Sequence, residues 1–406
     1  MNARSLSLYI HIPFCRAKCS YCDFNSYAGL EWFVPSYVDA LLAEMALWRQ
    51  LIQDMSVATV FFGGGTPSLL PLAQVERIVA ALRQHLCLAT AAEVSFEANP
   101  GTVDRAYLSG LLRLGVNRLS LGVQSFQDDE LRTLGRIHTA EEAREAFRLA
   151  RQAGFANVNL DLIYGLPRQT LTGWQRTLNE AIALGPDHLS LYALTLEEGT
   201  RLAEDVACGR LLRPDADLAA DMYVWAEEAL AAAAYQHYEI SNWALPGGRC
   251  RHNLTYWLNR PYLGLGAGAH SCLGGFRFAN VRDPREYVRL VKEGAELQRA
   301  ADGLASSSFA SLRTSLAGLL HVVLAEEVST ARAMAETAVL GLRLVEGLSL
   351  AEFRRRFGAE LMSAYGPQVE ELETLGLLER ANGCLRLTPR GRLLGNEVFE
   401  RFLPDT

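Results

Sequence analysis

Three cysteines near the N-terminus have the spacing of iron–sulfur ligands. Cys15, Cys19 and Cys22 lie in the stretch His-Ile-Pro-Phe-Cys-Arg-Ala-Lys-Cys-Ser-Tyr-Cys-Asp-Phe. Thiolates at this spacing can bind three irons of a cubane [4Fe–4S] cluster. Because no fourth cysteine follows closely, one iron would stay open to an exogenous ligand. The triplet therefore predicts a reaction centre as well as a metal site.

Two other interpretations of the triplet are a structural zinc site and buried thiols that only pack. Structural zinc takes four ligands, usually from two paired knuckles, whereas the remaining five cysteines are scattered singly along the chain. A disulfide framework is not expected in a chain of 406 residues with eight cysteines. The N-terminus has no basic segment followed by an apolar run, which favours a reducing, cytoplasmic location.

A glycine-rich turn follows an apolar stretch further along the chain. Residues 57–62 are typical of a strand and lead into Gly63-Gly64-Gly65-Thr66-Pro67. Glycines lack a Cβ atom, so their backbone can adopt positive φ and bring N–H and C=O groups against a small polar ligand. The plainer interpretation is a strand-to-helix turn without a ligand.

The first 200 residues alternate short apolar runs with longer stretches of helical periodicity. The expected strands are Ser5–Ile12, Thr59–Phe62, Glu93–Ala98, Arg118–Val123, Val158–Tyr164 and His188–Leu194. The expected helices are Pro35–Asp54, Leu70–Leu86, Asp104–Leu114, Ala140–Ala153 and Leu171–Ala183. This alternation predicts an α/β fold with a parallel sheet and right-handed crossovers, here an incomplete (β/α)6 barrel.

Polar residues lie at or near the ends of three predicted strands. Glu97 closes the third strand, Gln124 and Ser125 close the fourth, and Asp161 interrupts the fifth. In parallel α/β folds, ligands gather at the carboxyl ends of the strands. An ionised carboxylate inside a barrel is costly unless a ligand or a charge compensates it. We therefore expect a polar ligand here, with simple solvation of the strand ends as the alternative.

The cysteine triplet resembles the cluster motif of the radical S-adenosylmethionine (SAM) superfamily, which has an aromatic residue, here Tyr21, before the last cysteine. The resemblance implies that the amino and carboxylate groups of SAM chelate the open iron. It also implies an electron donor, because one electron from the cluster cleaves SAM. The glycine turn of this superfamily holds the SAM amino group, which implicates Gly64, Gly65 and Thr66.

Other motifs extend the resemblance to the coproporphyrinogen III oxidase-like branch of the superfamily, along most of the chain. The matching motifs are Tyr9 with His11-Ile-Pro-Phe-Cys15, Gly-Gly-Gly-Thr-Pro, Glu97-x-Asn-Pro, Gly-Val-Gln-Ser-Phe, Leu134-Gly-Arg136-x-His138 and Asp161-Leu-Ile-x-Gly-Leu-Pro. The residues that would line the SAM site by this resemblance are Tyr9, Glu97, Gln124, Arg136 and Asp161.

Two functions compete within the branch. One is an oxygen-independent coproporphyrinogen III oxidase, which decarboxylates two propionates on the way to heme; the other is a heme chaperone, which binds heme and passes it to acceptor hemoproteins. Phe24 stands where the oxidase has a fourth cysteine, and the cluster strand begins a few residues after Met1, where the oxidase has an extension. The segment His252-Asn-Leu-Thr-Tyr256-Trp257 resembles a motif of the chaperone type. These features favour the chaperone, and whether the chain is also an enzyme stays open.

The same segment suggests a heme site. A neutral imidazole from His252 is a good axial ligand for heme iron, and Tyr256 and Trp257 offer flat apolar faces for a porphyrin. His270 is the rival ligand, in the glycine-rich stretch 264–271. That stretch lacks the last glycine and the strand context of a dinucleotide fingerprint, so no nicotinamide cofactor is expected.

The chain divides into a barrel over 1–240, a connecting segment over 241–299, a linker or local insertion over 300–333 and a winged-helix-like helical domain over 334–406. Winged helices often bind DNA, but the formal net charge of −7 leaves no electrostatic footprint for phosphates. We expect neither nucleic-acid binding nor a transmembrane segment, since no apolar run approaches 18 residues.

Overall fold

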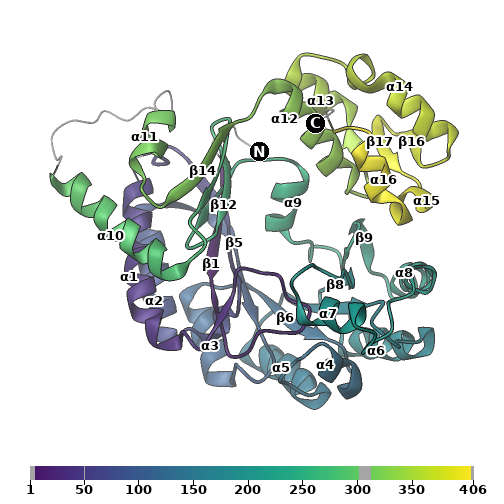
Figure 1. Ribbon diagram of the computed structural model, residues 1–406, viewed down its shortest axis with the longest axis horizontal. Coiled ribbons are helices and arrows are strands. Elements are labelled where there is room, and N and C mark those ends of the chain that lie inside the picture. The colour runs from purple at the N-terminus through teal and green to yellow at the C-terminus, as the bar shows by residue number, and fades with distance from the viewer. Residues whose placement is uncertain (1–4, 50, 301–311, 404–406) are drawn as a thin grey trace.

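Six parallel strands form the centre of a twelve-stranded sheet (Figure 1). The computed structural model describes residues 5–49, 51–300 and 312–403. In their order along the sheet, the six strands are β1 (Ser5–Ile12), β4 (Ser56–Gly64), β5 (Cys87–Ala98), β6 (Arg118–Gln124), β7 (Val158–Tyr164) and β8 (His188–Ala193). Each pairs in parallel with the next, which confirms the six strands expected from the sequence.

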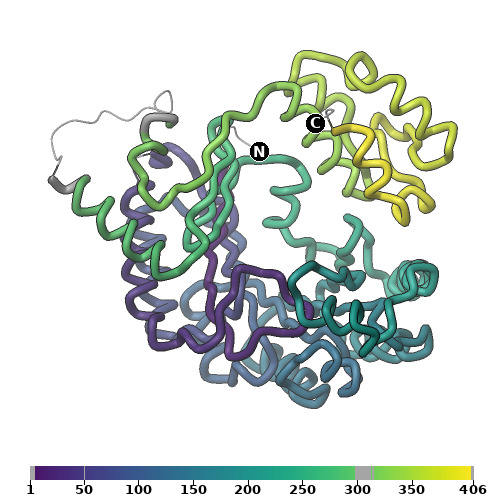
Figure 2. The backbone as a smooth tube through the Cα atoms, in the orientation of Figure 1, coloured from purple at the N-terminus to yellow at the C-terminus, as the bar shows by residue number. Residues whose placement is uncertain are grey.

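Amphipathic helices return the chain from one strand to the next and cover the outer face of the sheet (Figures 1 and 2). The helices between the six strands are α1 (Val34–Trp48), α2 (Leu72–His85), α3 (Arg105–Leu114), α4 (Asp128–Thr133), α5 (Ala140–Ala153) and α6 (Leu171–Leu184). The first of them is shorter than the expected Pro35–Asp54. The chain leaves the helix after Trp48 and makes a turn that buries Ile52 and Met55, so these apolar residues reach the core without helical geometry.

Shorter strands extend the sheet on both sides. The strand β11 (Tyr262–Leu265) lies parallel to β1 and is followed outward by the antiparallel strands β12 (His270–Leu273), β13 (Phe276–Asn280) and β14 (Val322–Glu327). Beyond β8 lie β10 (Asn242–Ala244) and β9 (Gln236–Glu239), both antiparallel. The edge strands are thus β14 and β9, and the sheet is an open, incomplete barrel.

Segments after β8 fill the rest of the large domain. They comprise α7 (Arg201–Ala207), α8 (Ala216–Ala232), α9 (Arg251–Trp257), α10 (Pro284–Ala300) and α11 (Leu312–Gly318). Within the segment 300–333, residues 301–311 lie outside the described residues, while β14 pairs with β13. In the parts of the chain that the structure describes, no helix combines the length and apolar character that crossing a bilayer requires.

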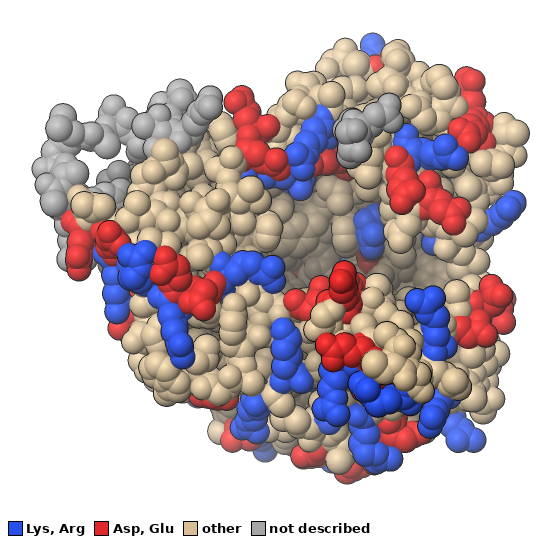
Figure 3. Space-filling model, in the orientation of Figure 1, with Lys and Arg blue, Asp and Glu red and all other residues tan. Residues whose placement is uncertain are grey.

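The C-terminal domain has a core of its own and a small antiparallel sheet. Its elements are α12 (Thr330–Leu342), β15 (Leu348–Ser349), α13 (Leu350–Phe357), α14 (Leu361–Thr374), β16 (Leu378–Ala381), β17 (Cys384–Leu387), α15 (Pro389–Leu393) and α16 (Gly395–Glu400). The strands β16 and β17 form the expected hairpin, and the Thr388 hydroxyl accepts a hydrogen bond from the Gly391 N–H as a helix cap. Figure 3 shows the surface hollowed between this domain and the barrel.

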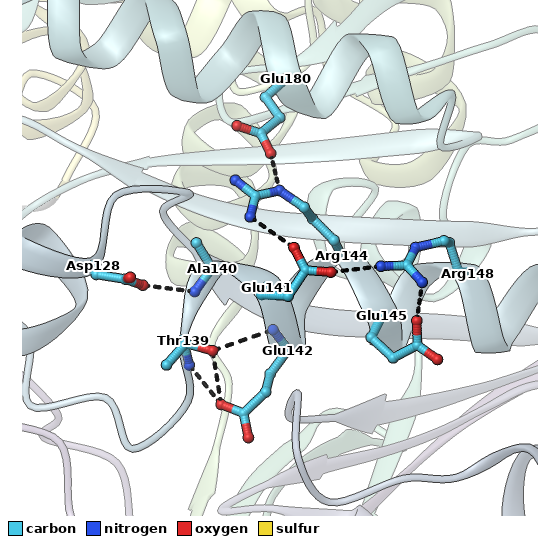
Figure 4. A network of polar contacts seen from close by, with 9 residues as sticks. All are labelled: Asp128, Thr139, Ala140, Glu141, Glu142, Arg144, Glu145, Arg148 and Glu180. Atoms are coloured by element: carbon cyan, nitrogen blue, oxygen red, sulfur yellow. Dashed lines mark hydrogen bonds and ion pairs between the residues drawn. The ribbon is translucent and has the colours of Figure 1, made fainter.

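A polar network anchors the start of α5 (Figure 4). The Thr139 hydroxyl accepts from the Glu142 N–H, the Glu142 carboxylate accepts from the Thr139 N–H, and Asp128 accepts from the Ala140 N–H. Arg144 then joins α5 to Glu180 of α6. These contacts fix the start of α5 and join this helix to α6. The loop 134–138, which leads into the cap, is therefore held in place.

Candidate functional site

The three cysteines and most of the predicted SAM residues line one cavity of about 420 Å³ at the carboxyl ends of the strands. The residues that share its wall with the cysteines are Gly64, Gly65, Thr66, Glu97, Gln124, Arg136 and Asp161. They come from four neighbouring strands, the turn after β4 and one loop, so the fold gathers residues that are far apart in the sequence. Of the predicted SAM residues, Tyr9 alone lies outside this wall, in a neighbouring cavity.

The cysteine loop leaves β1 through the short strand β2 (Phe14–Cys15). The Cys15 Sγ lies 3.5 Å from the Thr66 Oγ1, and the Cys22 Sγ lies 3.9 Å from the Ser26 Oγ. Burial raises the pKa of both thiols, so metal binding must displace their protons. No three His, Cys, Asp or Glu side chains of the described residues converge to hold a single ion. In a cubane each thiolate binds a different iron, so three separate sulfurs around a cavity fit that group.

A chain of hydrogen bonds connects two of the cysteines. The Asn99 amide donates to the Thr66 Oγ1 at 3.0 Å, next to Cys15, and its Oδ1 accepts from the Arg136 Nη2 at 2.6 Å. The Arg136 Nη1 donates to the Cys19 Sγ at 3.4 Å. Arg136 thus places a positive charge and an N–H donor beside the Cys19 sulfur.

The glycine turn is shaped by close approach of the cysteine strand. Gly64 has φ of 113°, and a Cβ atom on it would lie 2.6 Å from the His11 ring. A Cβ on Gly65 would lie 2.7 Å from the Phe14 carbonyl oxygen. The turn therefore requires glycine at both positions for packing, and it leaves their backbone on the cavity wall.

Gln124 has an unusual backbone for a residue with a side chain. Its φ is 68°, and the pairing of β6 with β7 shifts register just before it, as in a bulge. A left-handed conformation at a residue other than glycine costs about 1–3 kcal/mol, and the surrounding structure must compensate this cost. This bulge places the side chain of Gln124 on the cavity wall.

Two carboxyl groups face the cavity from neighbouring parts of the sheet. Burial, and then the charge of Asp161, raise the pKa of Glu97 to about 8. Burial also raises the pKa of Asp161, whose carboxylate accepts from the Ser120 hydroxyl at 2.9 Å and the Asn159 amide at 2.8 Å. A cationic ligand would favour the ionised form of both groups.

We expect the contribution of Glu97 to the stability of the apoprotein to fall as pH rises from about 5 to about 8. Over this range the unfolded Glu97 carboxyl is ionised, whereas the folded one, with a pKa near 8 against an ordinary 4.5, keeps its proton. Unfolding thus releases a proton, and rising pH favours the unfolded state. Chemical denaturation at several pH values should show that Glu97→Gln gains stability relative to the wild type as pH rises over this range, because the amide has no proton to release. A stability difference between the two proteins that does not change with pH would contradict this assignment.

A second cavity of about 550 Å³ adjoins the first and holds the predicted heme residue Tyr256. It is also lined by Tyr9, Tyr262 and the exposed His270. The Asn25 carbonyl can only accept, so the His11 Nε2 carries the ring proton and donates to it. The His11 Nδ1 is then the acceptor for the Tyr9 hydroxyl, at 3.0 Å. Burial lowers the pKa of His11 to about 4, so this ring stays neutral.

The other two predicted heme residues are engaged elsewhere. His252 is 1% exposed, and its two ring nitrogens bond to the Thr59 hydroxyl at 2.8 Å and the Tyr256 hydroxyl at 3.0 Å. Trp257 does not line the second cavity; its ring packs under the Arg343 guanidinium at 4.3 Å. Of the three, Tyr256 alone presents a surface to the second cavity.

A buried glutamate holds the loop that precedes His270. The Glu44 carboxylate, on α1, accepts from the Gly266 N–H, the Asn280 amide and the Tyr287 hydroxyl. It also lies 3.2 Å from the His321 Nε2, which belongs to the segment 300–333. The glycine-rich loop is therefore rigidly placed, and His270 with it.

Sequence reasoning did not identify Asn99, Ser120 or Tyr192 as site residues, although all three line the first cavity. Asn99 follows Glu97 in a matching motif, and this position was the available signal. Ser120 and Tyr192 sit on strand faces that point inward, which strand periodicity predicts only once the register is known.

Comparison with known proteins places the chain in a family. The family model described as "Radical SAM superfamily" matches residues 9–181, and the one described as "HemN C-terminal domain" matches residues 328–394. The heme chaperone HemW of Bacillus subtilis (strain 168) is 36% identical over 98% of this chain and 99% of that protein. The chain belongs to the HemW family of radical SAM proteins. The HemW protein of Escherichia coli (strain K12) is 37% identical over 98% of both chains.

A solved structure shares the HemW fold seen here. Coproporphyrinogen III oxidase (HemN) from Escherichia coli superposes with a TM-score of 0.82 over 98% of this chain and 90% of that chain, at 24% identity. This likeness confirms the radical SAM fold, including the C-terminal domain, that the sequence predicts.

Proposed function

We propose that the chain is a heme chaperone that binds a [4Fe–4S] cluster, SAM and heme, and passes heme to acceptor hemoproteins. The observation that carries the proposal is the likeness, over almost the whole chain, to proteins named as heme chaperones. The eight cysteines are free thiols, which suits the reducing, cytoplasmic location expected from the sequence.

The first cavity would hold the cluster and SAM. Cys15, Cys19 and Cys22 would bind three irons, and the cluster, when bound, supplies one electron at its open iron after reduction by an electron donor. Arg136 keeps the Cys19 sulfur in an electropositive setting. The exposed backbone of Gly64 and Gly65 and the polar side chains across the cavity would orient SAM.

The second cavity would hold heme. Phe24, which is 64% exposed, lines both cavities, and Tyr256 and Tyr262 add aromatic surface. Flat apolar walls with one convergent nitrogen donor suit a porphyrin. The sequence favours His252 as the iron ligand, but both nitrogens of that ring are already bonded, so the geometry favours its rival His270.

The ligand assignment has a direct spectroscopic test. Wild-type protein should bind about one heme per chain, and His270→Ala should shift the Soret band and weaken binding. His252→Ala is the matched control and should change the band less. A larger change in the His252 variant would return the ligand to that residue.

The same preparation separates the chaperone from the oxidase. Heme-loaded protein should transfer heme to an apo-hemoprotein, measured by the recovered absorbance of the acceptor. Coproporphyrinogen III with SAM, a reductant and an electron acceptor should remain unconverted. Formation of protoporphyrinogen IX would overturn the proposal in favour of the oxidase.

A further inference from the structure

A third cavity of about 190 Å³ lies inside the barrel, between the other two. It shares Ser120, Asp161 and Tyr192 with the cysteine cavity, and it shares Tyr9 and Tyr256 with the cavity of His270. Glu97 lines all three. The third cavity therefore shares wall residues with both proposed ligand sites, and it also has lining residues of its own.

Arg118 is the unusual residue of this third cavity. It begins β6, is 2% exposed and lines the cavity. Within the described part of the chain, its Nε atom has no hydrogen-bond partner. A buried guanidinium without an acceptor is costly, because it loses its hydration without compensation. The side chain thus points to an acceptor that occupies the cavity.

The nearest acidic groups are committed to other donors. The Glu93 carboxylate accepts from the Arg251 N–H at 2.9 Å and the His252 N–H at 3.0 Å, at the start of α9. Asp161 accepts from Ser120 and Asn159. Both acids influence Arg118 through their charge, but their oxygens are already used by these neighbours.

The other walls suit a small anion. Asn253 brings an amide group to the cavity, whereas the Asn159 amide and the Ser190 hydroxyl already donate to neighbouring side chains. A guanidinium presents parallel N–H groups that match the two oxygens of a carboxylate. In the absence of SAM, the pKa of Glu97, raised to about 8, leaves that carboxyl protonated at neutral pH, so it can donate to an anion instead of repelling it.

We propose that this cavity is a carboxylate subsite, in which Arg118 binds a propionate arm of a tetrapyrrole that occupies the cavity of His270. The inference rests on the proposed function, because it takes heme as the ligand of the adjoining cavity. The shared residues Tyr9, Glu97 and Tyr256 mark where the arm passes from one cavity to the other. A free small carboxylate is the other source of the same chemistry.

The test compares heme with heme dimethyl ester, whose propionates carry no charge. Wild-type protein should bind heme about tenfold to a hundredfold more tightly than the ester, the range expected for a charge-assisted hydrogen bond. Arg118→Met should lose that preference through weaker heme binding, with ester affinity unchanged. Arg343→Met, a partly buried arginine outside the three cavities, should keep it.

Each outcome decides one point. If Arg118→Met still prefers heme to the ester, the subsite is overturned and the proposed function stands. If wild type binds no heme, the proposed function itself is overturned. A third outcome is that wild type binds heme and the ester equally well, while sodium propionate raises the unfolding midpoint of wild type but not of Arg118→Met. This outcome would assign the cavity to a free carboxylate and reject the tetrapyrrole arm.

A conservative variant keeps the test decisive if Arg118→Met does not fold, as judged by iron content and the unfolding midpoint. Arg118→Lys keeps the charge but cannot pair two oxygens in parallel, so the preference for heme should fall without vanishing. An unchanged preference in this variant would contradict the bidentate site.

Discussion

Replacing Cys15, Cys19 and Cys22 together by alanine should reduce the iron content after anaerobic reconstitution from about four per chain to none. The three sulfurs are the thiols that line the cavity, and each would bind a different iron. Removing all three leaves Thr66, Ser26 and Arg136 without a sulfur to contact, and none of these side chains replaces a thiolate as an iron ligand. Iron and sulfide analysis together with visible absorbance measures the result.

Matched controls come from cysteines outside the cavity. Cys87 is exposed at the start of β5 and Cys384 lies in the C-terminal hairpin, so alanine at either position should leave the iron content unchanged. Arg136→Met should lower the iron content in part, because the Cys19 thiolate loses its electropositive neighbour. Full cluster absorbance in the triple variant would refute the assignment.

The sequence predicts the framework of this site well because its signals are local. Apolar runs and helical periodicity identify the six parallel strands and most of the helices between them, and the short spacing of the cysteines keeps them in one loop. Carboxyl ends of parallel strands share one edge of the sheet, so Glu97, Gln124 and Asp161 were expected to meet, and all three line the cavity.

The sequence is less informative where tertiary contacts decide the surroundings of a residue. The aromatic and imidazole groups of 252–257 suggested one heme surface, yet a seven-residue helix directs successive side chains to different faces. His252 points to Thr59 on β4, while Trp257 points to Arg343 of the C-terminal domain. Tyr9 precedes Cys15 by only six residues, but it lies within β1, whereas Cys15 lies beyond the end of that strand, and Tyr9 lines the second cavity.

The interior cavity was invisible in the sequence for the same reason. Arg118 reads as an ordinary polar residue at the start of a strand, a position where solvation is the usual outcome. Its burial depends on α9, whose start is fixed by Glu93 from β5, 158 residues earlier in the chain than Arg251. No local pattern encodes a contact of that kind.

Asp161→Asn should weaken SAM binding about tenfold to a hundredfold while leaving the iron content unchanged. The Asp161 carboxylate faces the cavity, where it would accept hydrogen bonds from the hydroxyl groups of a cationic ligand. A hydrogen bond to a charged group contributes about 1.5–3 kcal/mol. It binds no iron in the proposed site, so the cluster should survive. Titration of SAM followed by the paramagnetic resonance spectrum of the reduced cluster measures the change.

The same variant should not destabilise the apoprotein, which separates a loss of function from a loss of fold. Burial raises the pKa of Asp161, so its ionised form is unfavourable in the folded state; the amide removes that cost but keeps one acceptor oxygen of two, so the net change in stability should be small. Asp161→Ala should be less stable than Asp161→Asn, since it leaves the Ser120 hydroxyl and the Asn159 amide without their acceptor.

The control is Asp23→Asn. Asp23 is an exposed carboxylate at the rim of the same cavity, where solvent screens its charge, so the affinity for SAM should change by less than about twofold. Equal losses of affinity in the Asp23 and Asp161 variants would mean that only the overall charge of the cavity matters. An unchanged affinity in Asp161→Asn would remove this residue from the SAM site. A larger loss at Asp161, at unchanged or higher unfolding midpoint, would establish that the protein retains a costly buried carboxylate because its ligand requires it.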